Sequence, residues 1–183
     1  MQSRRYCLIE AIVVLLLAAF AVRADTPSGP KEGDKVPPLK AYAVNGDEKE
    51  KDVDFLAQRK DKPTIYVFVA AKSFDRPMFR FLKKLDEELP ENASVVAVWL
   101  PADVDESKQY LAKIAQYFKK TALAVSDSTA GPKDWGINAD AHLTAVVVNK
   151  GKVIKSQGFQ SINETDAPDL TDALKKSAGS GSR

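Results

Sequence analysis

The sequence predicts an α/β protein of three layers, in which helices cover both faces of a mixed central sheet. Short runs of β-branched and aromatic residues, typical of buried strands, alternate with segments whose apolar residues recur at helical spacing. Such alternation implies right-handed crossovers and parallel strand pairing. Near the end of the chain, two strand-like runs flank Lys150-Gly151. These runs predict a closing hairpin, which adds antiparallel strands to the sheet.

The first elements are expected in residues 39–71. Residues 39–44 alternate in character and predict an edge strand, and Asn45-Gly46 then gives a turn signal. Residues 53–57 are a short apolar segment with the length of one helical turn. Residues 63–71 (PTIYVFVAA) are a continuous apolar run, which is typical of a strand buried on both faces.

Two amphipathic helices and two more strands are expected next. Residues 78–89 place six apolar side chains on one helical face. These side chains are Met78, Phe79, Phe81, Leu82, Leu85 and Leu89. Residues 94–100 (SVVAVWL) predict a second buried strand, with Trp99 in the core. Residues 105–118 predict the second helix, with Leu111, Ile114 and Phe118 inward, and residues 122–125 predict a short strand.

The closing part of the domain is a hairpin followed by a helix. Residues 143–149 and 152–157 flank the Lys150-Gly151 turn. Residues 166–177 predict a final helix with Leu170 and Leu174 on one side.

The first residues have the pattern of a secretory signal peptide. Arg4 and Arg5 precede an apolar run at 11–22 that is short for a membrane-spanning helix. Small residues at Val22 and Ala24 then predict cleavage after residue 24. The alternative is an uncleaved anchor, which would place the protein at a membrane. Cleavage predicts an exported protein in the periplasm or outside the cell.

The domain plan therefore has four parts: a signal peptide at 1–24, an extended linker at 25–36, the folded domain at 37–176, and a disordered tail at 177–183. The linker is rich in Pro, Gly, Lys and Asp, and the tail reads SAGSGSR.

Charge and cysteine content narrow the range of functions that the sequence supports. The leader holds three of the 27 basic residues and one of the 25 acidic residues. Residues 25–183 therefore carry 24 basic and 24 acidic residues. A net charge near zero gives no sign of nucleic-acid binding, which favours a basic face. Cys7, the only cysteine, lies in the leader. The processed chain would therefore have no cysteine in a compartment that permits disulfides.

The order of elements resembles that of the thioredoxin-like superfamily. Short sequence motifs resemble those of its redoxin branches, the peroxiredoxins and TlpA-like proteins. The resemblance begins at Gly33-Asp34-Lys35-Val36-Pro37 and continues through Lys62-Pro63 before the strand. It resumes at Val125-Ser126-Asp127, Trp135-Gly136-Ile137 and the hairpin at 149–153. It covers residues 32–176 and implies a thioredoxin-like fold.

The departures from these families are informative. The resemblance implies a nucleophilic cysteine where this chain has Ser73 and a resolving cysteine where it has Arg76, just before Pro77. It implies a cis-proline where this chain has His142, the only histidine. Because a cis bond before a non-proline residue costs about 3 kcal/mol, a trans bond is expected there. A serine hydroxyl has no thiolate and no redox couple, so thiol–disulfide and peroxidase chemistry are not expected.

The candidate site residues each have two interpretations. Ser73 is either the N-cap of the following helix, with Asp75 in its first turn, or a nucleophile beside His142. Arg76 is either solvated or meets an anionic ligand at the helix N-terminus. Trp135 and Asp127 are candidates for binding at the rim of a cleft, with core packing as the alternative for Trp135. One histidine with scattered acids is a poor metal site, so neither a metal nor another cofactor is expected.

Three functions follow. The favoured one is a non-catalytic binding or scaffold module for an unidentified protein, peptide or small ligand. The second is an enzyme built on Ser73, Asp75, Arg76 and His142. The third is a redoxin by descent, which residues 25–183 support only if a partner supplies the thiols.

Overall fold

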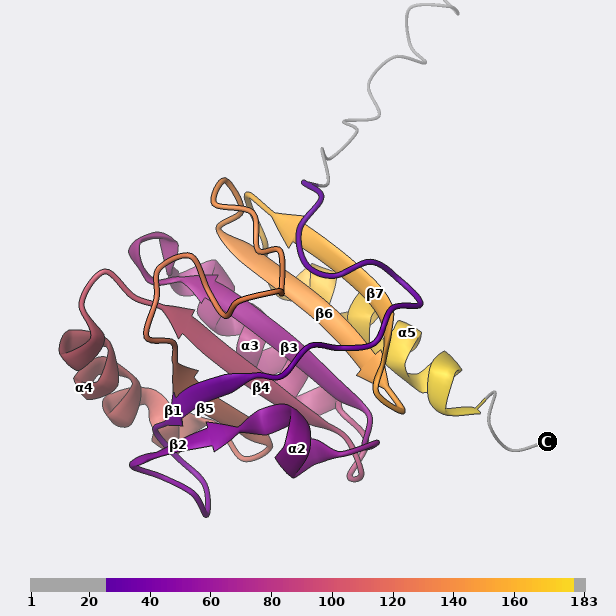
Figure 1. The fold of residues 1–183 in the computed structure, drawn as a ribbon, viewed down its shortest axis with the longest axis horizontal. Helices are drawn as coiled ribbons and strands as arrows, with labels where there is room; N and C mark the ends of the chain where they lie inside the picture. Colours follow the sequence, from indigo (N-terminus) through magenta and orange to yellow (C-terminus); the bar gives the residue numbers. More distant parts are fainter. Residues whose placement is uncertain (1–25, 180–183) are drawn as a thin grey trace, which may run out of the picture.

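The computed structural model describes residues 26–179, which form one seven-stranded mixed sheet with helices (Figure 1). The strand order across the sheet is β2-β1-β5-β4-β3-β6-β7. The three central strands β3, β4 and β5 are parallel, and the flanking pairs are antiparallel.

The strands are β1 Lys40–Ala43, β2 Lys51–Asp54, β3 Thr64–Ala70, β4 Ser94–Leu100, β5 Thr121–Val125, β6 Leu143–Asn149 and β7 Lys152–Phe159. The helices are α2 Phe55–Arg59, α3 Arg76–Glu88, α4 Val104–Ile114 and α5 Ala167–Gly179, with 3₁₀ turns η1 Ala71–Ser73, η2 Ala115–Tyr117 and η3 Glu164–Asp166.

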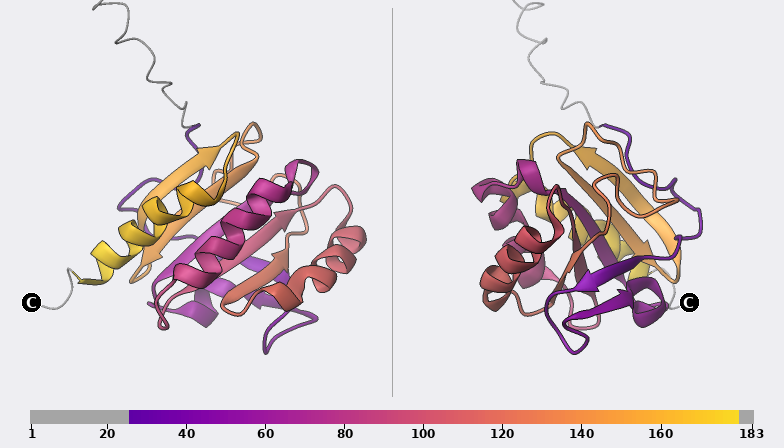
Figure 2. Two further views of the ribbon diagram at one scale, coloured as in Figure 1. Left: turned by 180° about the vertical axis from the view of Figure 1, so that it is seen from behind. Right: turned by 60° about the vertical axis from the view of Figure 1, so that its left-hand side comes forward.

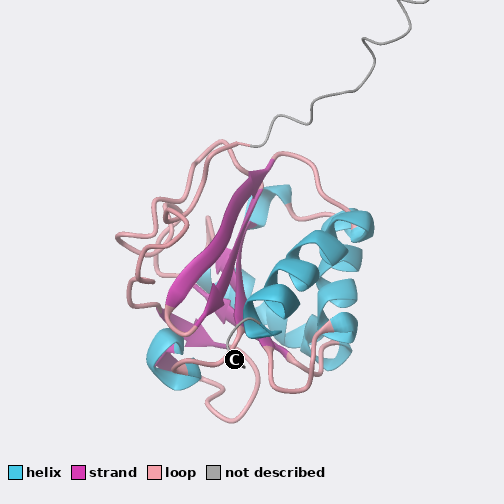
Figure 3. Cartoon of the chain, turned by 90° about the vertical axis from the view of Figure 1, so that its right-hand side faces the viewer, coloured by secondary structure: helices cyan, strands magenta, loops and turns pink. Residues whose placement is uncertain are grey.

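The predicted three-layer α/β fold with a mixed central sheet is confirmed, but its two outer layers are unequal. The steps from β3 to β4 and from β4 to β5 run in the same direction across the sheet, so right-handed crossovers place α3 and α4 on the same face. Helix α5 lies beside them (Figure 2, left). The other face carries only the short helix α2 and coil (Figure 3).

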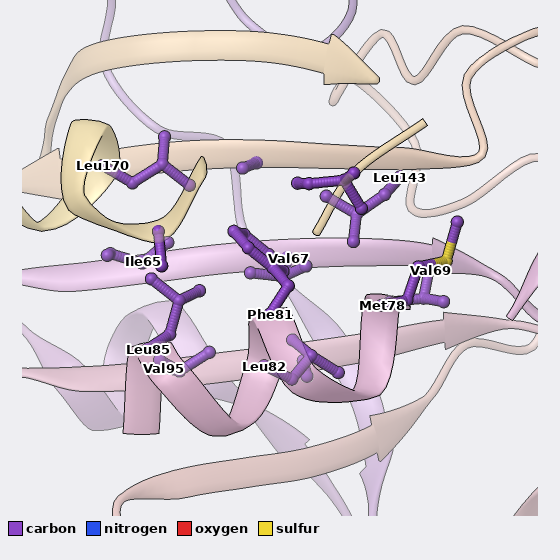
Figure 4. Close-up of a cluster of buried hydrophobic side chains, with 14 of the residues drawn as sticks. Ile65, Val67, Val69, Met78, Phe81, Leu82, Leu85, Val95, Leu143 and Leu170 are labelled. Atoms are coloured by element: carbon purple, nitrogen blue, oxygen red, sulfur yellow. The ribbon is translucent and has the colours of Figure 1, made fainter. Parts of the chain in front are cut away.

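Each face of the sheet has its own hydrophobic core. Under the long helices, β3 contributes Ile65, Val67 and Val69, which pack against one face of α3 (Figure 4). On the other face, the alternate residues Tyr66 and Phe68 pack with Trp135. Both sets are buried because β3 lies in the middle of the sheet, as the continuous apolar run predicts.

The inward faces of the predicted helices are confirmed. In α3 the side chains of Met78, Phe81, Leu82 and Leu85 are buried, whereas Phe79 is half-buried against Phe118. In the other two long helices the buried side chains include Leu111, Leu170 and Leu174. Trp99 is also buried, as predicted.

The edge strand was placed wrongly by the sequence. Strand β1 is not an edge, because β2 covers its outer side and β5 its inner side. Strand β2 overlaps the segment at 53–57 that predicted only a helical turn, and α2 begins directly after it. The sequence KDVD has only one apolar residue and therefore gives little indication of a strand. All four residues are exposed or half-buried. Asp54 is the N-cap of α2 and accepts from the backbone N–H groups of Leu56 and Ala57.

A buried carboxylate ties α3 to the start of β5. The Asp86 side chain is only 3% exposed. Its oxygens accept from the backbone N–H of Lys119 and Lys120 and from the hydroxyl of Thr121, at 2.7–3.1 Å. These three donors satisfy a carboxylate that would otherwise be costly to bury.

Residues 26–36 pack against the domain. The backbones of Thr26 and Gly158 exchange hydrogen bonds of 3.3 and 3.0 Å. The Ser28 hydroxyl lies 2.6 Å from that of Thr144 and accepts from the Asn138 N–H. This segment therefore adds a short extra pairing to β7 and holds the loop before β6.

The other predicted domain boundaries fall near or beyond the ends of the described residues. The predicted signal peptide at 1–24 lies outside the described residues, as do residues 180–183 of the predicted tail. Helix α5 runs through Gly179, so residues 177–179 are helical. No helix among residues 26–179 is long and apolar enough to cross a membrane.

Substitution of Leu85 by Ala is expected to lower the free energy of unfolding by about 2–5 kcal/mol, because its side chain is fully buried between α3 and the sheet. Glu87→Ala, on the exposed side of the same helix, is the control and should change stability by less than about 0.5 kcal/mol. Urea unfolding monitored by circular dichroism measures both. Equal effects of the two substitutions would contradict the assigned inward face.

Substitution of Gly158 by Ala is expected to displace residues 26–29 from β7. An added Cβ would lie 2.5 Å from the Thr26 carbonyl oxygen and 2.7 Å from the Ser28 Cβ, so the segment must move. Amide hydrogen exchange at Thr26 and Gly158 should become faster, with a stability loss of about 1–3 kcal/mol. The control is Gly179→Ala, which adds its methyl group in open space. Unchanged exchange in Gly158→Ala would show that this docking is not tight.

Candidate functional site

The candidate site lies where β3 ends and α3 begins. Strand β3 ends at Ala70, the 3₁₀ turn η1 follows, and α3 begins at Arg76. Asp75 is the N-cap, because its Oδ1 accepts from the Met78 N–H at 2.9 Å. Pro77 lies in the first turn, where its missing N–H breaks no helical hydrogen bond.

The predicted capping role of Ser73 is therefore wrong. Ser73 is half-buried at the end of η1, two residues before the actual cap. The reason is local: η1 takes up residues 71–73 and delays the start of the helix. The pattern of a small polar residue before an apolar helix fits either position, so the sequence alone did not separate Ser73 from Asp75.

The backbone at His142 lies beside this junction, as the fold resemblance implied. The Ala70 N–H donates to the His142 carbonyl at 3.0 Å, and the His142 N–H donates to the Phe159 carbonyl at 2.9 Å. The peptide bond before His142 is trans, as predicted. The imidazole itself is exposed.

The four catalytic candidates do not form a hydrogen-bonded group. No side-chain hydrogen bond joins Ser73, Asp75, Arg76 or His142 to one another within residues 26–179, and the Asp75 carboxylate is engaged as the helix cap. A nucleophile and its base need contact at about 2.6–3.2 Å. The arrangement therefore lacks the contact on which a serine–histidine mechanism depends. In the same part of the chain, no three His, Cys, Asp or Glu side chains gather as metal ligands.

The two candidates for cleft-rim binding have different positions. Trp135 is fully buried, its indole N–H donates to the Pro38 carbonyl at 3.0 Å, and its ring packs on Tyr66 and Phe68. Rim binding by Trp135 is thus wrong, and the packing alternative holds. Asp127, which follows β5, is exposed.

Two hollows lie at the carboxyl ends of β3 and β4, and Lys72 and Ala102 line both. We call the first the aromatic hollow. It has a volume of about 390 Å³ and is lined by Ala71, Lys72, Phe74, Trp99, Ala102, Asp103, Glu106, Ser107 and Tyr110. The Phe74 ring lies 4.9 Å from that of Trp99 and 6.0 Å from that of Tyr110, centre to centre. Tyr110 is 41% exposed, and its partial burial raises its pKa.

We call the second the alanine hollow. It has a volume of about 350 Å³ and is lined by Ala70, Lys72, Leu100, Ala102, Thr129, Ala130, Ile137, Asn138, Ala139 and Ala141. Lys72 is its only charged residue. Mostly apolar walls with a few polar groups are typical of small-ligand sites. Neither hollow is lined by Ser73, Asp75, Arg76 or His142.

Sequence reasoning missed Lys72, Phe74 and Tyr110. The sequence could have indicated Lys72 and Phe74, because they follow soon after the buried strand β3. The carboxyl ends of parallel strands often bind ligands. Tyr110 gives no such signal. It lies on α4, and its contact with Phe74 forms only in the folded structure.

Comparisons with known proteins identify the fold. The chain is similar to a putative thiol:disulfide interchange protein DsbE from Chlorobium tepidum, with a TM-score of 0.61 and 20% identity over 80% of this chain and 96% of that one. An exposed lipoprotein thioredoxin, Etrx1, from Streptococcus pneumoniae is also similar, with a TM-score of 0.57 and 20% identity over 76% of this chain and 99% of that one. A peroxiredoxin-like protein from Aquifex aeolicus has a TM-score of 0.55 and 17% identity over 83% of this chain and 90% of that one.

The protein thus has the thioredoxin-like fold, and several of the solved structures similar to it are redoxins. No protein-family model matches the sequence, and no curated protein matches it either. The predicted resemblance in fold is confirmed, and residues 26–179 contain no cysteine.

Substitution of Asp75 by Ala is expected to destabilise the protein by about 1 kcal/mol, because it removes the N-cap acceptor of α3. Ser73→Ala is the matched control. It should change the free energy of unfolding by less than about 0.5 kcal/mol, since Ser73 does not cap the helix. Thermal or urea unfolding measures both. A larger loss for Ser73→Ala than for Asp75→Ala would restore Ser73 as the cap.

Proposed function

We propose that this chain is an exported thioredoxin-fold binding module that performs no thiol–disulfide or peroxidase chemistry. The observation that carries the proposal is the composition of the β3–α3 junction. The backbone elements of a redoxin site are present, with η1, an N-terminal helix end and the His142 loop side by side. The residues at the two expected sulfur positions are Ser73 and Arg76.

The chemistry of these side chains supports the proposal. A helix N-terminus lowers a thiol pKa and so favours the thiolate nucleophile. A serine hydroxyl in that place stays protonated at neutral pH and forms neither a disulfide nor a sulfenic acid. An arginine cannot resolve a mixed disulfide. The exchange reaction therefore lacks both of its sulfur atoms.

The binding role is supported by the aromatic and alanine hollows. Together they offer apolar walls, three aromatic rings and the Lys72 ammonium at the carboxyl ends of β3 and β4. We infer that this face binds a protein, a peptide or a small ligand. The export proposal rests on the leader pattern of residues 1–24, and one structural neighbour is described as an exposed lipoprotein.

The experiment compares two versions of the protein that begin at residue 25, in insulin-reduction and peroxide-consumption assays. The native version is expected to be inactive, because it has no cysteine. The Ser73→Cys, Arg76→Cys variant places two thiols at the start of α3 and is expected to gain insulin-reducing activity. Ser73→Cys alone is the control and should not complete the dithiol cycle.

Turnover of either substrate by the native version would contradict the proposal and require a redox centre without cysteine. An enzyme built on Ser73 and His142 is a separate outcome. It would appear as a hydrolytic activity that both Ser73→Ala and His142→Ala abolish without a change in Tm.

A further inference from the structure

A second candidate binding surface lies at the opposite end of β3, away from the two hollows. The turn at residues 59–62 and the tip of the β6–β7 hairpin meet there. The Lys150 N–H donates to the Asp61 carbonyl at 3.3 Å, and a Cβ on Gly151 would lie 3.8 Å from the Asp61 Oδ1. We call this surface the basic end, and its five cations are Arg59, Lys60, Lys62, Lys150 and Lys152.

The charge of the basic end is not neutralised locally. No ion pair within residues 26–179 includes any of its five cations, whereas lysines on the long helices pair with acids one turn away. Asp61 and Glu91 are the acids beside the hollow at this end, so the group carries 5 − 2 = +3. Lys35 pairs with Lys152 in an isolated bridge, and the neighbouring Asp34 offsets its charge. The rest of residues 25–183 carries 19 basic and 22 acidic residues, which is −3.

The basic end also contains a hollow of about 570 Å³. It is lined by Arg59, Lys60, Asp61, Lys62, Pro63, Glu91, Asn92 and Ser94. Three of its lining side chains are therefore cations, and they come from one four-residue turn. Such a concentration of positive charge in a concave surface attracts anions.

Arg59 is the most specific feature of this hollow. Its side chain is half-buried, and burial lowers its pKa. Its Nε donates to the Thr64 hydroxyl over 3.4 Å, which is a long hydrogen bond. The remaining four guanidinium N–H donors have no acceptor among residues 26–179. A guanidinium that is partly withdrawn from water and has no carboxylate partner is suited to an oxoanion, which it can bind through two parallel hydrogen bonds.

We propose that the basic end binds a multivalent oxoanion, namely a phosphate or sulfate group that is free or carried by a small molecule. Arg59 makes the directional contact, and Lys60 and Lys62 supply charge from the same turn. Lys150 and Lys152 extend the positive surface toward the hairpin tip. The two acids of the hollow, Asp61 and Glu91, repel an anion, but the three cations of the turn outnumber them. This inference is independent of the proposed function, because the two surfaces share no residue.

The basic end lies far from the first described residue of the chain. The described chain begins at Thr26, which pairs with Gly158 near the far end of β7, whereas Lys152 begins that strand (Figure 1). The six residue steps from Lys152 to Gly158 separate these two points by roughly 20 Å.

Isothermal titration of the purified protein with inorganic tripolyphosphate tests the proposal. We expect saturable binding that weakens as salt rises. Arg59→Gln should reduce the affinity about tenfold or more, because it removes both charge and paired donors. Arg59→Lys keeps the charge and should show a smaller loss. Lys83→Gln and Lys175→Gln, which change ion-paired lysines elsewhere on the surface, should leave the affinity unchanged.

The outcomes separate the alternatives. Absence of tripolyphosphate binding, or equal binding by native protein and Arg59→Gln, would overturn the proposal. If Arg59→Gln fails to fold by circular dichroism, the exposed double variant Lys60→Gln, Lys62→Gln decides, with unchanged affinity as the overturning result. Vesicles of phosphatidylglycerol form the last arm. Binding to vesicles but not to tripolyphosphate would assign the surface to a membrane and also overturn the proposal.

Discussion

The position of β3 in the middle of the sheet constrains the rest of the structure. A central strand must satisfy its backbone groups on both sides, and β3 pairs in parallel with β4 and antiparallel with β6 over nearly its whole length. Its side chains are buried on both faces, so Ile65 packs in the hydrophobic core on one face of the sheet and Tyr66 in the core on the other. The end of β3 at Ala70 then fixes where η1, α3 and the His142 loop meet.

The junction between β3 and α3 has the backbone arrangement of the thioredoxin-like fold, and residues 26–179 contain no cysteine. Asp75 caps α3, and Pro77 occupies its first turn, so the helix N-terminus is well formed. The electrostatic effect of that helix end would act on a thiol, but Ser73 offers only a hydroxyl. This junction provides two concave surfaces, the aromatic hollow and the alanine hollow, and Lys72 and Ala102 line both. A rigid scaffold with concave apolar surfaces is sufficient for binding.

Charge is distributed unevenly between the two ends of the sheet. Asp75, Asp103 and Glu106 are exposed acids at the carboxyl ends of β3 and β4, and they outnumber the exposed cations Lys72 and Arg76 there. The opposite end carries the five cations of the basic end, and no acid among residues 26–179 forms an ion pair with them. The near-zero net charge of residues 25–183 hides this separation, because opposite charges cancel in a sum but not in space.

The sequence by itself determined the fold class, the buried strands, the inward faces of the long helices and the absence of cysteine from residues 25–183. These features depend on hydrophobic periodicity and on residue type, which are local properties of the chain. It did not determine β2, whose residues KDVD have no clear pattern, or the cap, since Ser73 and Asp75 both fit that role. Only the tertiary structure decided that Trp135 is core, that Tyr110 joins Phe74, and that the 59–62 turn meets Lys150. Each of these contacts joins residues far apart in the chain, and their meeting depends on strand order and crossover direction rather than on any local pattern.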